Sequence, residues 1–241
     1  MNLLKNILQF NVVDTRITIN QKIELIPIIE LIYGDENIEI PKKYPYWENI
    51  DLWDAYHQNC YEKAGFVDEL IPYIRGSHFY KLEEISKKNL TKITIDHTND
   101  LRNGKYERKD ALGFSGGYVL RVDGIDEFFP QCCGELSDIA FWKNITNCKN
   151  SYYEGHPAPQ CKFEKNLIIL DFTTEEFDEP FQPPVNCDKI KLNINELKNA
   201  VQKVNTQLKN FEKRLEEINF VENLNIKNIG ELLIWENLNY Q

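Results

Sequence analysis

The sequence predicts an α+β fold: a mixed, mainly antiparallel sheet with flanking helices and a long amphipathic helix near the C-terminus. Short β-branched or apolar segments, bounded by turn residues, are typical of strands. Segments of helical periodicity lie mostly apart from them, which favours α+β over a doubly wound parallel sheet. The clearest helical pattern is a regular apolar stripe over residues 197–218.

Strands are expected in both halves of the chain. Residues 16–19 alternate, and residues 28–33 and 38–40 flank Gly34–Asn37, which predicts a hairpin. Pro27 indicates an edge or the start of a strand. Further strands are predicted at 92–97, 117–122 and 167–172. Asn103-Gly104 and Asp123-Gly124 are typical of turns between antiparallel neighbours.

Helices are predicted at 51–64 and 67–74, with Asp51 as a cap and Gly65 as the stop of the first. In the C-terminal helix, Asn195 is the expected cap, and apolar side chains recur with a four-three spacing at Leu197, Val201, Val204, Leu208, Phe211, Leu215 and Ile218. We expect this stripe to pack on the protein's own body or on residues 226–238. The alternative is a homodimer through the 197–218 helix.

The chain of 241 residues is long enough to bury a genuine core. We expect one α+β domain over residues 1–241. Residues 172–187 carry acidic residues and prolines and read as an extended surface connection. A sub-boundary is therefore possible near 173–187, with 188–241 as a helical C-terminal segment.

The composition indicates a compartment and a type of partner. With no apolar run of membrane-spanning length and no export signal in the first residues, we expect a cytoplasmic protein with reduced thiols and no membrane partner. The net charge of −10 argues against nucleic acid, which needs clustered Lys and Arg. It favours a basic protein partner, although acidity also serves solubility alone.

Four of the six cysteines lie between Cys132 and Cys161. Thiolate and imidazole are zinc ligands, so Cys133, Cys148, His156 and Cys161 form a candidate zinc site. The spacing is unusual for zinc, because the only close pair, Cys132-Cys133, would point to opposite faces of an extended chain. Cysteines are also common core residues. His57 and Cys60, three residues apart on a predicted helix, are further candidates, with Cys60 on the apolar stripe.

Two sequence features could belong to a nucleophilic enzyme: a Gly-x-Ser-x-Gly motif and a cysteine–histidine pair. Gly113–Gly117 matches Gly-x-Ser-x-Gly, but a predicted strand follows Ser115 where a hydrolase needs a helix. A glycine turn into a strand is the better interpretation. A nucleophilic Cys132 or Cys133 with His97 or His156 as base is the other possibility, supported by residue type alone.

Aromatic side chains beside carboxylates suit a face that binds a basic protein. The residues assigned to such a face are Trp47, Trp53, Asp126, Glu127, Glu175, Glu176 and Asp178. The functional hypothesis is a non-catalytic, immunity-type inhibitor that occludes a cognate toxin, such as a basic nuclease. The alternative is a zinc protein or enzyme centred on residues 132–161, and no cofactor is expected otherwise.

Overall fold

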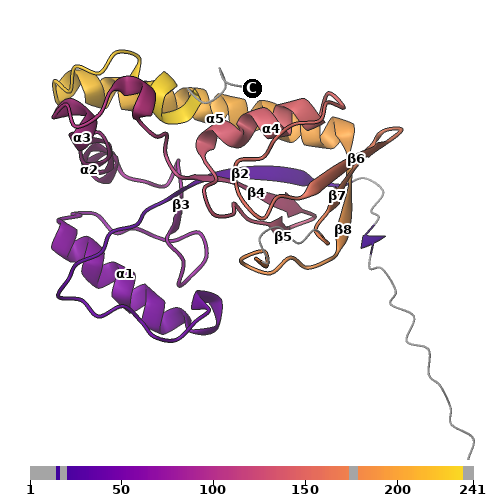
Figure 1. The fold of residues 1–241 in the computed structure, drawn as a ribbon, viewed down its shortest axis with the longest axis horizontal. Helices are drawn as coiled ribbons and strands as arrows, with labels where there is room; N and C mark the ends of the chain where they lie inside the picture. Colours follow the sequence, from indigo (N-terminus) through magenta and orange to yellow (C-terminus); the bar gives the residue numbers. More distant parts are fainter. Residues whose placement is uncertain (1–14, 17–20, 174–178, 236–241) are drawn as a thin grey trace, which may run out of the picture.

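The computed structural model describes residues 15–16, 21–173 and 179–235. These residues form two four-stranded sheets with helices packed around them (Figure 1). The α+β class predicted from the sequence is confirmed.

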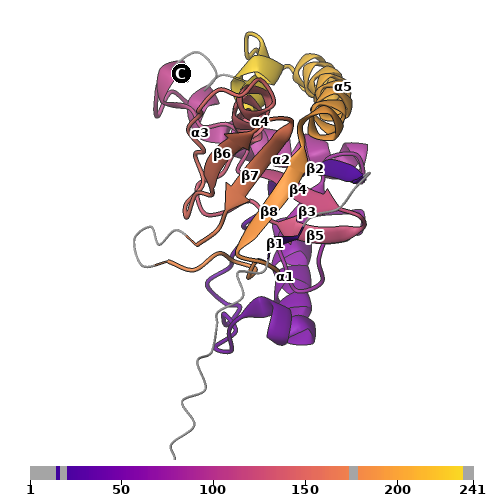
Figure 2. The ribbon, with the colours of Figure 1, turned by 90° about the vertical axis from the view of Figure 1, so that its right-hand side faces the viewer.

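The first sheet has the order β1-β8-β7-β6 and faces the viewer in Figure 2. Its strands are β1 (Thr15–Arg16), β6 (Gln160–Glu164), β7 (Leu167–Asp171) and β8 (Lys189–Asn193). The second sheet has the order β3-β2-β4-β5. Its strands are β2 (Ile23–Glu30), β3 (Phe79–Lys81), β4 (Gly116–Val122) and β5 (Ile125–Phe128). All pairings are antiparallel except the parallel pair β1–β8, so the sheets are mainly antiparallel, as expected.

Helices of very different lengths surround the sheets. They are α1 (Ile50–Ala64), α2 (Lys87–His97), α3 (Asn99–Arg102), α4 (Ile139–Ile145) and α5 (Ile194–Val221), with the short 3₁₀ helices η1 (Tyr46–Glu48), η2 (Arg108–Asp110) and η3 (Leu136–Asp138) and the π-helix η4 (Glu231–Trp235). Helix α5 contacts β2 of one sheet and β8 of the other, and α1 lies at the opposite side of the molecule (Figures 1 and 2).

Helix α5 follows directly from its apolar spacing. The seven stripe residues from Leu197 to Ile218 are all buried within the chain. The helix begins earlier than predicted because Asn193, not Asn195, is the cap: its side chain accepts hydrogen bonds from the backbone N–H groups of Asn195 and Glu196. The expected packing of the stripe on the protein's own body is confirmed. A homodimer through residues 197–218 would have to use other side chains of this helix, and it stays a prediction.

Helix α1 also has the predicted extent. Its cap is Asn49 rather than Asp51. It ends at Gly65, whose φ of 88° is the left-handed conformation that glycine adopts at least cost. The buried side chains are Trp53, His57, Cys60 and Tyr61, so one face of α1 carries an aromatic cluster.

The predicted strand at 92–97 is wrong, because these residues belong to helix α2. Ser86 caps this helix by accepting a hydrogen bond from the Asn89 N–H, and Leu90 and Ile93 are buried at helical spacing. The hydroxyl of Thr94 donates to the Leu90 carbonyl one turn earlier, which satisfies this β-branched residue inside a helix. The Asn103-Gly104 turn accordingly follows helix α3 and joins no strands.

The predicted hairpin over residues 28–40 is also wrong. Residues 28–30 instead end strand β2, where they pair with β3 and β4, while residues 38–40 form no strand. Pro27 lies inside β2 rather than at its start, but outside the ladder with β3, which covers only Ile28–Glu30.

Residues 67–74 form no helix, contrary to expectation. The Asp68 backbone is instead paired with the side chain of Asn89, through Asn89 Nδ2 to the Asp68 carbonyl at 2.7 Å and the Asp68 N–H to Asn89 Oδ1 at 3.3 Å. A side chain from α2 therefore takes up backbone groups that a helix would have used.

The Asp123-Gly124 turn joins β4 and β5 as predicted. Before it, the glycine turn leads Ser115 into β4, and no helix follows, so the geometry of a hydrolase nucleophile is absent there. Gly116 has a φ of 135°, and a Cβ at this position would lie 2.3 Å from the Ile28 carbonyl oxygen. Only glycine lets the two backbones approach this closely.

The described residues of the segment 172–187 form no helix and bend at 182–183 and 186–187, and the segment is not wholly on the surface. Phe172 and Phe181 are buried, and both rings pack against Phe128 of β5, with centroids 5.6 and 6.0 Å away. This packing attaches the segment to the core at Phe172 and Phe181. The possible sub-boundary at 173–187 stays a prediction.

Candidate functional site

The two adjacent cysteines occupy a tight turn. The turn spans Gln131–Gly134 and is closed by a hydrogen bond from the Gly134 N–H to the Gln131 carbonyl at 3.0 Å. Cys133 has a φ of 66°, in the left-handed region. The extended geometry assumed from the sequence therefore does not apply, and the two sulfurs lie on the same side, 3.6 Å apart.

His156 is held next to this turn by its own backbone. Its N–H donates to the Cys132 carbonyl at 3.0 Å, in an isolated antiparallel bridge. Its ring Nδ1 lies 3.0 Å from Glu179 Oε2. The ligand atoms of Cys132, Cys133 and His156 all lie within 4.8 Å of one another. Two thiols and one imidazole therefore converge at the surface.

Asp138, at the end of η3, forms hydrogen bonds to the segment that follows the Cys132–Cys133 turn and to the segment that precedes His156. One carboxylate oxygen accepts the Glu135 N–H at 3.2 Å, and the other accepts the Glu154 N–H at 3.0 Å. Burial raises the pKa of Asp138 to about 7, although these two hydrogen bonds act in the opposite direction.

The predicted zinc ligands do not all come together. Cys133 and His156 join Cys132, which the predicted set omitted, whereas Cys148 and Cys161 lie outside this group. Cys148 is exposed in the turn after α4. Cys161 is half-buried on β6 against the core, and burial raises the pKa of its thiol to about 12.

Cys132 lacks the lowered thiol pKa of an activated nucleophile. The pKa of Cys132 is raised, chiefly by its contact with Cys133, then by burial and by neighbouring charges that include Glu30 and Glu179. A catalytic cysteine needs the opposite shift. His97 is engaged elsewhere: its Nε2 lies 2.9 Å from the Leu112 carbonyl oxygen, and its ring packs on Phe114.

A second group of polar side chains lies between α1 and β3. The sequence indicated its His57 and Cys60 as further metal candidates, but not Glu30 and His78. His78 Nε2 is 2.6 Å from Glu30 Oε1, and the His57 ring is 5.6 Å from the His78 ring. Burial, followed by His78, lowers the pKa of His57 to about 4. Within the described chain His57 Nδ1 has no hydrogen-bond partner, and Cys60 is buried one turn further along α1.

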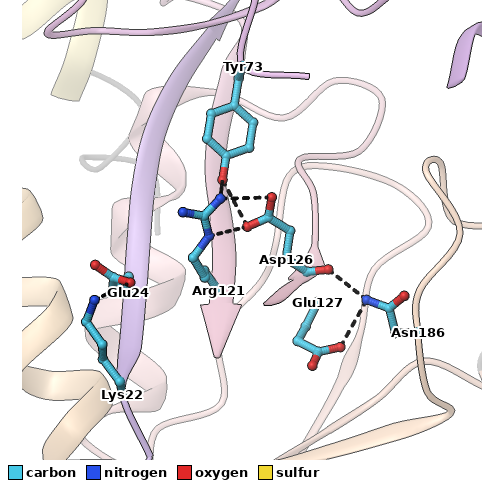
Figure 3. Close-up of polar contacts among 7 residues, drawn as sticks. All are labelled: Lys22, Glu24, Tyr73, Arg121, Asp126, Glu127 and Asn186. Carbon is cyan, nitrogen blue, oxygen red and sulfur yellow. Dashed lines mark hydrogen bonds and ion pairs between the residues drawn. The ribbon is translucent and has the colours of Figure 1, made fainter. Parts of the chain in front are cut away.

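Most of the described residues assigned to a partner-binding face are used inside the protein (Figure 3). Asp126 is ion-paired with Arg121 at 2.6 Å and accepts a hydrogen bond from the Tyr73 hydroxyl. Glu127 is 1% exposed and contacts Asn186.

Trp53 is buried as well, and its Nε1 donates to the Lys43 carbonyl. Trp47 alone among the described candidates lines a surface depression. Glu175, Glu176 and Asp178 lie outside the described residues.

That depression is an open groove of about 870 Å³ beside the Cys132–Cys133 turn. Its walls come from the segment before α1 and from the described ends of the 172–187 segment. Aromatic, proline and carboxylate side chains line it, among them Tyr44, Trp47, Glu179, Phe181, Pro184 and Val185. Glu179 therefore belongs both to the groove and to the surroundings of His156.

Comparison with protein-family models, curated proteins and solved structures found no match to this chain. Of the helices in the described part of the chain, none has both the length and the apolar character needed to cross a membrane. The groove and the group formed by Cys132, Cys133 and His156 are the features of the described surface from which a function can be inferred.

Proposed function

We propose that this protein is a non-catalytic inhibitor of the immunity type, which binds a basic toxin in the cytoplasm and occludes its active site. The partner class is a positively charged protein, with a nuclease as the specific case. The groove lined by Tyr44, Trp47 and Glu179 is the docking site in this proposal.

The observation that carries the proposal is the chemistry of this groove. Tyr44 is 67% exposed and Trp47 is half-buried, and both line a concave surface with Pro180 and Pro184. Exposed aromatic side chains in a depression are the usual anchors of protein interfaces, because they bury a large apolar area at a small entropic cost.

Charge supplies the preference for a basic partner. The chain carries 38 acidic against 28 basic residues. The exposed carboxylate of Glu179 lines the groove, and the exposed Glu48 follows Trp47 in the sequence. Opposite net charge accelerates association and fixes orientation. A nuclease has a basic cleft for phosphates, so an acidic, aromatic surface is complementary to it.

The docking surface proposed here leaves out three of the residues that the sequence assigned to a partner-binding face. Asp126, Glu127 and Trp53 are bonded inside the protein, so their substitution would act through the fold. Trp47 remains, joined by Tyr44 and Glu179. Glu175, Glu176 and Asp178 stay predictions.

Co-production with the products of the flanking genes tests the proposal, because an inhibitor is commonly encoded beside its target. We expect one basic product to arrest growth when made alone and to be harmless, and recovered as a complex, when made with this protein. A set of flanking products of which none is toxic or binds would contradict the proposal.

A double variant and one control variant test whether the groove is the docking site. Tyr44→Ala with Trp47→Ala should abolish neutralisation while leaving the protein folded. Tyr152→Ala is the matched control, since Tyr152 is 65% exposed and does not line the groove. Equal loss in both variants would remove the groove as the docking site.

A further inference from the structure

We propose that Cys132, Cys133 and His156 bind one thiophilic metal ion, and that Zn²⁺ is the ion this ligand set fits. The proposal does not depend on the toxin-binding function. It replaces Cys148 and Cys161 of the predicted zinc set with Cys132.

The spacing of the ligand atoms matches a tetrahedral ion. With Zn–S near 2.3 Å and Zn–N near 2.0 Å, two sulfurs on one zinc lie about 3.8 Å apart, and a sulfur and a nitrogen about 3.5 Å apart. The sulfurs of Cys132 and Cys133 are 3.6 Å apart, and the three ligand atoms lie within 4.8 Å of one another. A small movement of the His156 ring completes the geometry.

The backbone holds the two sulfurs in this arrangement before any ion binds. The turn is closed at Gly134, whose carbonyl accepts the Gly116 N–H at 2.8 Å. A Cβ at Gly134 would lie 2.7 Å from the Gly116 oxygen, so only glycine allows this approach. The Cys132 carbonyl in turn accepts the His156 N–H. Preorganised ligands lower the entropic cost of binding a metal.

The environment of His156 is that of a metal-binding histidine. A ligating imidazole commonly donates its other ring N–H to a carboxylate, which fixes the ring and raises its basicity. Glu179 stands 3.0 Å from Nδ1 in this position. We therefore assign Nε2 to the metal and Glu179 to the support of the ring.

Three protein ligands leave the fourth tetrahedral position to water or to an added ligand, as in zinc sites of the open type. Both thiols are exposed, so an ion can reach them from solvent. On binding, each thiol releases its proton to solvent as its sulfur bonds to zinc, and no electron transfer is involved.

Spectroscopy with Co²⁺ tests the ligands directly. The full chain, kept reduced and stripped of metal, is first titrated with Co²⁺, and Zn²⁺ is then added to the cobalt-loaded protein. In a separate titration, competition with a chromophoric chelator gives the affinity for Zn²⁺. We expect one equivalent of Co²⁺ to give thiolate-to-cobalt charge transfer and the visible bands of a tetrahedral ion, and Zn²⁺ to displace it. Absence of the charge-transfer band at one equivalent would overturn the proposal.

Variants separate these ligands from the other cysteines. Cys133→Ser and His156→Gln should each weaken Zn²⁺ binding at least about tenfold, and Glu179→Gln by about tenfold with the cobalt bands retained. Cys148→Ser is the matched control, since Cys148 is also exposed. Zinc affinity that falls equally in Cys148→Ser, or that is unchanged in Cys133→Ser, would remove the proposed ligand set. Thermal melting verifies that each variant is folded.

Discussion

The carboxylate of Asp138 accepts a hydrogen bond from the backbone N–H of Glu154 at 3.0 Å. Its other oxygen accepts the N–H of Glu135. One buried side chain thus joins the segment after the Cys132–Cys133 turn to the segment before His156. The proposed metal ligands, which are distant in sequence, owe part of their relative position to this carboxylate.

Asp138 gives the protein a pH-dependent stability. The folded state binds the Asp138 proton more tightly than the unfolded chain does, so its contribution to stability is full below the ordinary value of 3.8 and is lost as the pH rises through about 7. At most about 4 kcal/mol is involved, at 1.36 kcal/mol for each pKa unit.

Asp138→Asn removes this titration. We expect the variant to be less stable than the wild type near pH 4, because an amide oxygen cannot accept both N–H groups as the carboxyl group does. The difference should shrink as the pH rises to about 8. Urea denaturation across this range measures it. A difference that is constant with pH would show that Asp138 does not titrate in this window.

His57 has the opposite effect. Its pKa is lowered from 6.5 to about 4, so stability is present above pH 6.5 and is lost as the pH falls toward 4. His57→Phe keeps a ring among Trp53, Tyr56 and Tyr61 and removes the proton. We expect a variant whose unfolding midpoint falls less on acidification than that of the wild type. Parallel midpoint curves for the two proteins would contradict this assignment.

Leu208 lies at the centre of the α5 stripe and is fully buried. Leu208→Ala should reduce the free energy of unfolding by about 2–5 kcal/mol through lost apolar burial and a residual cavity. Lys203→Ala, on the exposed side of α5, should change it by less than about 0.5 kcal/mol. Chemical denaturation measures both. A loss of less than about 1 kcal/mol in Leu208→Ala would contradict the burial of this side chain in the core.

The sequence was sufficient for elements whose periodicity is long or whose turns are distinctive. The α5 stripe, the Gly65 stop of α1 and the Asp123-Gly124 turn each gave the correct element. It was insufficient where β-branched residues lie in a helix. In α2, the Ser86 cap and the burial of Leu90 and Ile93 on one helical face outweigh the strand preference of the β-branched residues.

The candidate site was only partly predictable, because it depends on backbone conformation and on contacts between distant segments. The left-handed Cys133 brings two adjacent sulfurs together, whereas sequence alone suggested an extended chain. The glycine that follows Cys133 was the available signal for such a turn. Nothing in the spacing of His156 and Glu179, 23 residues apart, indicated that their side chains meet.

The proposed binding of this acidic protein to a basic partner can be measured in solution. Its most direct test is calorimetric titration of the partner recovered by co-production, at about 50 mM and about 500 mM NaCl, where screening differs strongly. We expect a one-to-one complex whose affinity falls at least about tenfold at the higher salt concentration. An affinity independent of salt, or no measurable binding at low salt, would contradict it.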